Sequence, residues 1–270
     1  MSRQSLLVAL VGLAAGTACR AHNYPSPLGP RYAGTVLVVR PPPPREGPRV
    51  FRVVTFNVKY GRRIDRAIAL LETSPALRDA DVIALQEMDA QGAQRVAEAL
   101  AMSHVYYPAT VHPKTGRDFG NAILSRWPIV ADEKIVLPHL ARFERSERIA
   151  TAATILVGDV TLRVYSVHLG TPVDIGAGSR RDQARAVLAD AGNYSRVVVI
   201  GDMNSRTIGK EFAAAGFLWA TEHNPTTHLA FNWDHIFFKG FGLADGVASG
   251  VARDTVGASD HRPVWAVATY

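Results

Sequence analysis

The sequence predicts an α+β sandwich in which two mostly antiparallel sheets pack together, with helices on their outer sides. Of the 270 residues, 47% are hydrophobic, so the chain can bury a large core. After Val50, short apolar or β-branched runs alternate with stretches of helical periodicity. Further along, several strand-like runs follow one another without a helix between them. This mixture of patterns is typical of the α+β class.

The spacing of apolar residues locates the individual elements. Three stretches have helical spacing, and they contain Ile64, Ala67, Ile68 and Leu71, then Val96 and Leu100, then Ala184, Val187, Leu188 and Ala191 within 182–193. Strand-like runs cover 121–124, 129–136, 150–157 and 161–167, and the turn Gly158-Asp159 joins the last two. No repeat or second linker interrupts this pattern, so we predict one catalytic domain over residues 50–270.

Residues 1–18 have the composition of an export signal. Arg3 precedes an apolar stretch over 6–15, and small residues then lead to Cys19, the only cysteine. The stretch is too short to span a bilayer as a mature helix. A lone cysteine at this boundary resembles the lipid-modified cysteine of bacterial lipoproteins, so we expect cleavage before Cys19 and a lipid anchor in a bacterial membrane, facing the periplasm or the cell surface. Plain secretion is the alternative, because Gly16 stands where such signals prefer Leu.

Residues 19–49 are rich in proline and include four consecutive prolines at 41–44. Such a segment is extended and stiff, so we predict a tether that lifts the domain off the membrane. The short apolar piece Val36-Leu37-Val38-Val39 interrupts it. This piece is either part of the tether or an edge strand of the domain, and the sequence leaves both interpretations open.

The chain is basic, with a formal net charge of +6, and Arg3 is the only charged residue within 1–18. The excess positive charge therefore belongs to the rest of the chain. It suits an anionic substrate such as nucleic acid, a phospholipid or a phosphorylated sugar. The arginine groups are dispersed, and groups of this kind are more often solvated faces than substrate contacts. They are Arg62-Arg63, Arg142 with Arg145 and Arg148, and Arg180-Arg181.

Polar groups of one chemical kind follow or interrupt the apolar runs. Successive runs lead to Asn57, to Glu87, to His168, to Asp202 and Asn204, and to Asp234, and the C-terminal region adds Asp260-His261. Any one of these residues alone is an ordinary turn former, helix cap or half-buried histidine. Strands that end at one rim of a sheet would bring the groups together. Their joint occurrence predicts hydrolysis of a phosphate ester.

Such hydrolysis needs a hard divalent cation that offsets charge on the phosphate. Carboxylate and carboxamide oxygens suit Mg²⁺ or Mn²⁺. We therefore predict that Asn57, Glu87 and Asp260 form the metal site and leave the ion mostly hydrated.

The remaining polar groups are predicted to carry the catalysis. His261 would be the base, with Asp234 holding its tautomer and raising its pKa. Asp202 and Asn204 would face the attacked phosphorus, and His168 would bind a phosphate oxygen. The other histidines have no comparable setting, and we interpret them as structural: His22, His104, His112, His139, His223 and His228.

Seven motifs follow one another after Val50: Thr55-Phe56-Asn57-Val58, Gln86-Glu87, the segment 120–126, Val167-His168-Leu169, Gly201-Asp202-Met203-Asn204, Trp233-Asp234-His235-Ile236-Phe237 and the segment 259–264. In this order they resemble the endonuclease/exonuclease/phosphatase superfamily, which has the DNase I fold. The resemblance implies a four-layered α/β/β/α sandwich of two mixed, mostly antiparallel sheets and Mg²⁺-dependent cleavage by in-line attack of water. By position it implies the same metal and catalytic residues, and it leaves open whether Asp202 or His261 takes the water's proton. It adds Asn121 and Arg148 as substrate-binding residues.

The expected function is an exported Mg²⁺-dependent phosphodiesterase, with extracellular nucleic acid slightly ahead of a phospholipid or sphingolipid headgroup as the substrate. One alternative is a phosphomonoesterase acting on inositol phosphates or phospholipids, and another is a non-catalytic binding protein that keeps the fold. The domain has about 220 residues, with only about 30 between Asn204 and Asp234. This leaves little room for substrate-gripping insertions, which, with the export signal, argues against DNA repair. We expect a monomer.

Overall fold

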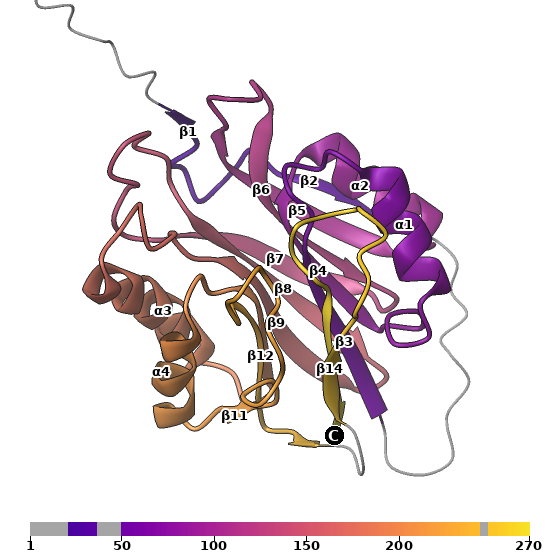
Figure 1. Ribbon diagram of the computed structural model, residues 1–270. Coiled ribbons are helices and arrows are strands. Elements are labelled where there is room, and N and C mark those ends of the chain that lie inside the picture. Colours follow the sequence, from indigo (N-terminus) through magenta and orange to yellow (C-terminus); the bar gives the residue numbers. More distant parts are fainter. Residues whose placement is uncertain (1–20, 37–49, 244–247) are drawn as a thin grey trace, which may run out of the picture.

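Two sheets lie face to face, and helices cover the outer side of each (Figure 1). The computed structural model describes residues 21–36, 50–243 and 248–270. The first sheet comprises β1 (His22–Asn23), β2 (Tyr32–Gly34), β3 (Val50–Asn57), β4 (Val82–Met88), β5 (Ser103–Val111), β6 (Asp118–Ser125), β13 (Gly242–Leu243), β14 (Ser249–Val251) and β15 (Val264–Thr269). The second comprises β7 (Ile129–Val136), β8 (Ile149–Val157), β9 (Val160–His168), β10 (Val197–Asp202), β11 (Leu218–Trp219) and β12 (Asp234–Lys239).

The predicted fold class is confirmed. Helices α1 (Ile64–Thr73) and α2 (Ala90–Ala99) cover the first sheet, while α3 (Ala177–Ala191), the 3-10 turn η1 (Arg206–Ile208) and α4 (Gly209–Ala214) lie along the second (Figure 1). The strand order is β1-β5-β6-β4-β3-β15-β13 in the first sheet, with β2 beside β5 and β14 beside β15, and β11-β12-β10-β9-β8-β7 in the second. Among the strands described, only the pairs β3–β4 and β9–β10 are parallel.

The long apolar runs of the central strands arise because both faces of these strands are buried. On β3, Val53 faces the core between the sheets, while its neighbour Val54 faces α1 and α2. On β10, Ile200 belongs to the core between the sheets, and Val199 packs with α3 and α4. Because successive side chains of a strand point to opposite faces, a strand covered on both sides needs apolar residues at every position.

The segment 21–36, predicted as part of a tether, instead belongs to the domain. Strands β1 and β2 pair antiparallel with β5, so an edge strand lies at Tyr32–Gly34, whereas residues 37–39 of the apolar piece lie outside the described residues. Arg31 forms two bonds of 2.6 Å with Asp132, and the ammonium group of Lys134 donates to the carbonyls of Tyr24 and Gly29 at 2.8 and 2.9 Å. The predicted export signal, Cys19 and the proline run lie outside the described residues. No helix in the described ranges is long and apolar enough to cross a membrane.

Strand ends from both sheets meet at one rim, which we call the active-site rim. In β10, Asp202 is the register partner of both His168 on β9 and Asp234 on β12. In the first sheet, Asn57 ends β3 next to the end of β4, where Glu87 lies. A hydrogen bond of 3.1 Å from Asn57 Nδ2 to Asp202 Oδ2 joins the two sheets at this rim.

Candidate active site

Asp202 lies at the centre of the candidate site and is only 1% exposed. Its Oδ2 is 3.1 Å from Asn57 Nδ2, 3.6 Å from His168 Nε2 and 3.8 Å from His261 Nε2. Its Oδ1 accepts the backbone N–H of Asn204 at 2.9 Å. Burial and the neighbouring Asp234 carboxylate raise the pKa of Asp202 above its usual range. The structure thus gathers the predicted catalytic groups around one carboxylate.

The ring of His261 is held by Asp234, as the sequence predicts. His261 Nδ1 lies 2.9 Å from Asp234 Oδ2, and both residues are buried. Burial by itself lowers the pKa of His261, but the carboxylates of Asp234 and Asp202 outweigh it and raise the pKa to about 10. Because Nδ1 is engaged, Nε2 is the ring nitrogen that faces Asp202 and the centre of the site.

His168 is buried against Arg148. The Nη1 atom of Arg148 lies 3.0 Å from both ring nitrogens of His168, and its guanidinium group packs over the Phe119 ring at 5.3 Å. Burial, together with the positive charges of Arg148 and His261, lowers the pKa of His168 well below its ordinary value. His168 is therefore neutral, and Arg148, predicted as a substrate-binding residue, supports it from a buried position.

Two predicted asparagines are fixed by backbone groups. Asn204 Nδ2 donates to the Leu169 carbonyl at 2.9 Å, which holds the loop after β10 against the loop after β9. Asn121, predicted to bind substrate, is 2% exposed. Its Nδ2 donates to the carbonyls of Ile149 and Ser166 at 2.9 and 3.2 Å, so its amide nitrogen joins β6 to the opposite sheet.

The residues predicted to hold the metal lie at the ends of β3 and β4 and on the loop before β15. Burial raises the pKa of Glu87, and a divalent cation would relieve a carboxylate whose charged form is disfavoured in this way. Burial by itself would raise the pKa of Asp260. The Lys59 ammonium group, 2.8 Å away, outweighs burial, so the pKa of Asp260 is lowered. The oxygen donors of Glu87 and Asp260 fit Mg²⁺ or Mn²⁺. The amide nitrogen of Asn57 donates to both Glu87 and Asp202, and its oxygen accepts the Lys59 N–H, so this side chain connects the predicted metal residue Glu87 to Asp202.

The backbone is strained at the same rim. Lys59, Tyr60, Glu87 and Asn204 have φ angles of 47°, 59°, 58° and 49°, in the left-handed region that side chains rarely adopt. Each such conformation costs about 1–3 kcal/mol and persists where the surroundings enforce it. One enforcing contact is the hydrogen bond of 3.1 Å from the Tyr60 N–H to Glu87 Oε2. Strain of this kind is typical of active sites.

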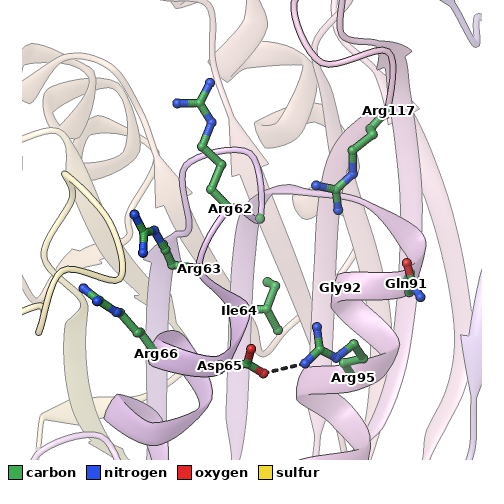
Figure 2. Close-up of a pocket in the computed structure, with 10 residues that line it drawn as sticks. Arg62, Arg63, Ile64, Asp65, Arg66, Gln91, Gly92, Arg95 and Arg117 are labelled. Carbon is green, nitrogen blue, oxygen red and sulfur yellow. Dashed lines mark hydrogen bonds and ion pairs between the residues drawn. The ribbon is translucent and has the colours of Figure 1, made fainter.

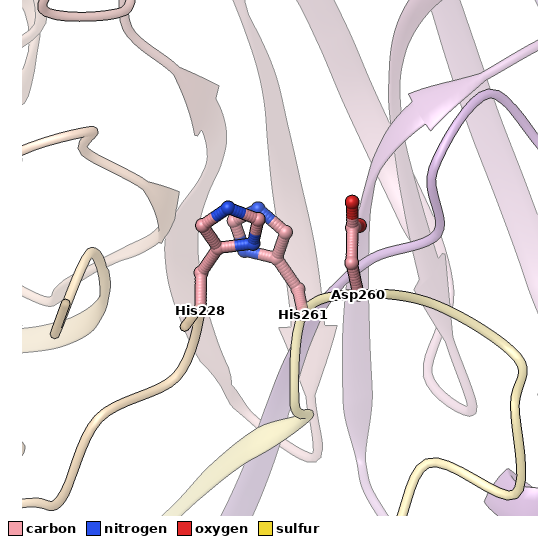
Figure 3. A group of neighbouring side chains, drawn as sticks. All are labelled: His228, Asp260 and His261. Carbon is pink, nitrogen blue, oxygen red and sulfur yellow. The ribbon is translucent and has the colours of Figure 1, made fainter. Parts of the chain in front are cut away.

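His228, which we interpret as structural from the sequence, lies at the site beside His261. The imidazole rings of His228 and His261 overlap face to face with centroids 4.3 Å apart, and the Asp260 carboxylate lies beside them (Figure 3). His228, Asp260 and His261 can bring one ligand atom each within 4.8 Å of one another. His228 also stacks on Trp233 at 5.1 Å. No strand ends at His228, so the strand-end pattern gives no signal for it.

A buried centre of aspartate, histidine and asparagine side chains at the shared rim of two stacked sheets defines a DNase I-like phosphoester hydrolase. The chain belongs to the endonuclease/exonuclease/phosphatase family, whose model matches residues 54–261. Members of this family are generally phosphoester hydrolases that use a divalent metal. No curated protein matches the sequence.

Solved structures share the fold at low sequence identity. An endonuclease/exonuclease/phosphatase from Beutenbergia cavernae is 20% identical, with a TM-score of 0.63 over 82% of this chain and 72% of its own. The catalytic domain of human nocturnin with a bound sulfate anion is 18% identical, with a TM-score of 0.64 over 82% and 94%. TDP2 from D. rerio, complexed with a single strand DNA product, is 18% identical, with a TM-score of 0.63 over 82% and 99%.

Proposed function

We propose that this protein is a phosphodiesterase that depends on Mg²⁺ or Mn²⁺ and cleaves its substrate by in-line attack of water. The observation that carries the proposal is the set of donors around Asp202 Oδ2, where Asn57, His168 and His261 all present nitrogen atoms within 3.8 Å. A phosphate group needs such donors for its non-bridging oxygens. Glu87 and Asp260 would hold a divalent cation, which would supply charge that offsets the phosphate.

In this proposal each side chain has a separate task. The Asp202 carboxylate accepts a proton from the attacking water, whose oxygen bonds to phosphorus. The bond from phosphorus to the leaving oxygen breaks, and that oxygen keeps the electron pair. His261, fixed through Nδ1 by Asp234, directs Nε2 to the phosphate, where it offsets the developing charge. His168 binds a non-bridging oxygen with Arg148 behind it.

Hydrolysis of bis(p-nitrophenyl) phosphate tests this function. The wild type should turn over with Mg²⁺ or Mn²⁺ and stop with EDTA. His261→Ala and Asp202→Asn should each lower kcat by about 10²–10⁴. His139→Ala is the control, because His139 is half exposed and pairs with Asp182 on α3. An inert wild type would favour a non-catalytic binding protein, and equal rates in His261→Ala and wild type would exclude the assigned role.

The substrate class is tested in parallel. A comparison with p-nitrophenyl phosphate separates a diesterase from a monoesterase acting on inositol phosphates or phospholipids. The net charge of +6 suits both a polynucleotide and a phospholipid headgroup, and the D. rerio structure with its single strand DNA product supports including an oligonucleotide. Plasmid DNA, sphingomyelin and inositol phosphates complete the panel.

We further propose that the protein is exported and anchored through a lipid on Cys19, as a monomer. Support comes from the apolar stretch over 6–15 and the small residues before this only cysteine. Metabolic labelling with a fatty acid should mark the wild type and leave Cys19→Ser unmarked. Equal labelling of both proteins would exclude the anchor.

A further inference from the structure

Large apolar side chains are exposed on the loops around the active site. We call the segments 137–148, 169–176, 220–233 and 252–263 the rim loops, because each leads into or out of a strand end at the active-site rim. Nine large hydrophobic side chains are exposed in the described part of the chain. Five of them are on the rim loops and are 48% to 78% exposed: Phe143, Val173, Leu229, Phe231 and Val256. Single exposed apolar residues are ordinary, but a gathering of them at the functional end of a molecule marks an interaction surface.

A cavity lined by arginines opens at the same end of the molecule. The cavity has a volume of about 340 Å³, and Gly61 is one of the residues that line it. Gly61 follows Tyr60, whose N–H donates to Glu87 in the active site. Figure 2 shows Arg62, Arg63 and Arg66 on one side of this cavity and Arg95 and Arg117 on the other. We call this cavity the arginine pocket.

The arginine pocket keeps an excess of positive charge. Arg95 is paired with Asp65 at 2.5 Å, and Arg117 is paired with Asp89. For Arg62 and Arg63, no carboxylate lies within ion-pair distance in the described part of the chain. The remaining arginine, Arg66, donates to the backbone carbonyl of Val256 at 3.3 Å, which places the pocket directly beside an apolar rim loop. Unpaired guanidinium groups in a concave site are suited to phosphate groups.

The N-terminal segment also enters the domain at this end. The Ala21 N–H donates to the Glu144 carbonyl on a rim loop at 2.8 Å, and Asn23 Nδ2 donates to the Arg145 carbonyl, also at 2.8 Å. Strand β1 pairs with the end of β5 at Val111, on the rim side of the sheet. The chain that precedes Ala21, with its apolar stretch over 6–15, therefore joins the domain beside the active site.

We propose that the active-site rim is a membrane-docking surface and that the substrate is a phospholipid headgroup in an anionic bilayer. The apolar side chains of the rim loops enter the interface, while the arginine pocket binds lipid phosphates. The assignment of the substrate rests on the phosphodiesterase function, whereas the docking surface does not. A polynucleotide would match the arginine pocket, but it gives no reason for apolar side chains on four loops around the same site. The bilayer accounts for both features and for the entry point of the N-terminal segment.

The single cysteine makes this orientation measurable. In the full chain carrying Cys19→Ser, an environment-sensitive fluorophore is attached to Phe143→Cys, Val173→Cys or Leu229→Cys, and to Val130→Cys or Leu218→Cys as controls. The two control side chains are exposed but lie on β7 and β11, outside the rim loops. With vesicles of phosphatidylcholine and phosphatidylglycerol, in EDTA, the rim labels should brighten about twofold or more and be quenched by nitroxide lipids. No response at the rim, or an equal response at the control positions, would overturn the proposal.

The charge on the arginine pocket is tested with matched variants. Arg62→Gln/Arg63→Gln should weaken binding to the anionic vesicles about tenfold or more. Arg78→Gln/Arg126→Gln removes the same charge near the opposite end of β4, where both residues pair with Asp79, and should bind like the parent. Equal losses in both double variants would overturn the role of the pocket.

Activity then separates the two proposals. Cleavage of oligonucleotides by a protein whose rim labels do not respond to vesicles would leave the phosphodiesterase function standing and exclude the membrane surface. If the rim labels insert into the vesicles but the protein hydrolyses none of the diesters tested, the docking surface would be confirmed and the phosphodiesterase function would be excluded. Hydrolysis of vesicle phospholipid would support both the phosphodiesterase function and the membrane surface. In that case Arg62→Gln/Arg63→Gln should lower kcat/KM for vesicle phospholipid about tenfold more than it lowers kcat/KM for bis(p-nitrophenyl) phosphate.

Discussion

The imidazole ring of His228 packs against His261 and fixes the position of that ring from the side opposite Asp260 (Figure 3). His228→Ala removes this packing, and we expect kcat with bis(p-nitrophenyl) phosphate to fall about tenfold or more, because small misplacements of a catalytic group are costly. His228→Phe keeps a flat ring at the same place and should retain most of the rate. The measurement is kcat for both variants at saturating Mg²⁺.

The pair of variants also distinguishes packing from metal binding. If His228 acts through a ring nitrogen on the ion, Phe cannot replace it, and His228→Phe will be as impaired as His228→Ala. In that case the Mg²⁺ concentration needed for half-maximal rate should rise in both variants. Equal Mg²⁺ dependence with restored activity in His228→Phe is the expected result.

The sequence predicts the positions of Asp202, His168 and Asp234 because each lies at a strand end, and strand ends are visible as places where apolar runs stop. Their register in β9, β10 and β12 then places them side by side. The sequence does not predict which groups the side-chain amides contact. Asn57 and Asn121 turn their amide nitrogens to carboxylates and carbonyls of other strands, and such tertiary partners leave no periodic signal.

At the level of the strand pair, Gly201 allows β10 to approach β9 closely. It has a φ of 149°, and a Cβ built there would lie 1.9 Å from the Val167 carbonyl oxygen. Gly201→Ala should therefore destabilise the fold by several kcal/mol, measured as the free energy of unfolding in urea. Gly178→Ala in α3 is the control, because open space surrounds that position and alanine favours the helix by about 0.5–1 kcal/mol. Similar effects of both substitutions would contradict this explanation.

The N-terminal segment adds stability to the edge of the first sheet. A chain that begins at Val50 leaves the buried ammonium group of Lys134 without its carbonyl partners and exposes β5. Its free energy of unfolding should be lower, by about 2 kcal/mol or more, than that of a chain that begins at Ala21. Urea titrations of the two chains provide the measurement. Identical midpoints would mean that the segment only rests on the surface.

Elements with a clear period are predicted from the sequence, and elements held by tertiary contacts are not. The runs over 129–136, 150–157 and 161–167 match β7, β8 and β9 to within about a residue at each end. The third helix begins at Ala177, five residues before the predicted start, because its first turn contains glycine and charged residues without an apolar stripe. Arg180 fixes this turn by donating to the carbonyls of Gly170 and Ile175. The short strands β1 and β2 exist only through pairing with β5.

Stability of the whole molecule should decline in mild acid because of His235. This residue is fully buried, and burial lowers the pKa of its ring to about 4. The unfolded chain, with a histidine pKa of about 6.5, takes up a proton between about pH 6.5 and pH 4, whereas the folded chain does not. The contribution of His235 to the free energy of unfolding is therefore fully present above pH 6.5. This contribution falls by up to about 3 kcal/mol as the pH drops to 4.

Thermal unfolding at several pH values between 4 and 7 measures this loss. His235→Gln removes the titrating ring, so the unfolding free energy of the variant should depend less steeply on pH than that of the wild type. Identical slopes for the two proteins would show that other groups cause the acid sensitivity.

The hydrogen bond between Asn57 and Asp202 crosses from one sheet to the other, and it has a consequence for the order in which the molecule acquires activity. One sheet alone holds His168, Asp202 and Asp234, and the other holds Asn57 and Glu87. If these residues act together, as we propose, a chain with either sheet formed by itself should be inert toward phosphate esters. Hydrolysis should then begin only once the two sheets have docked, so the appearance of turnover would report when docking occurs.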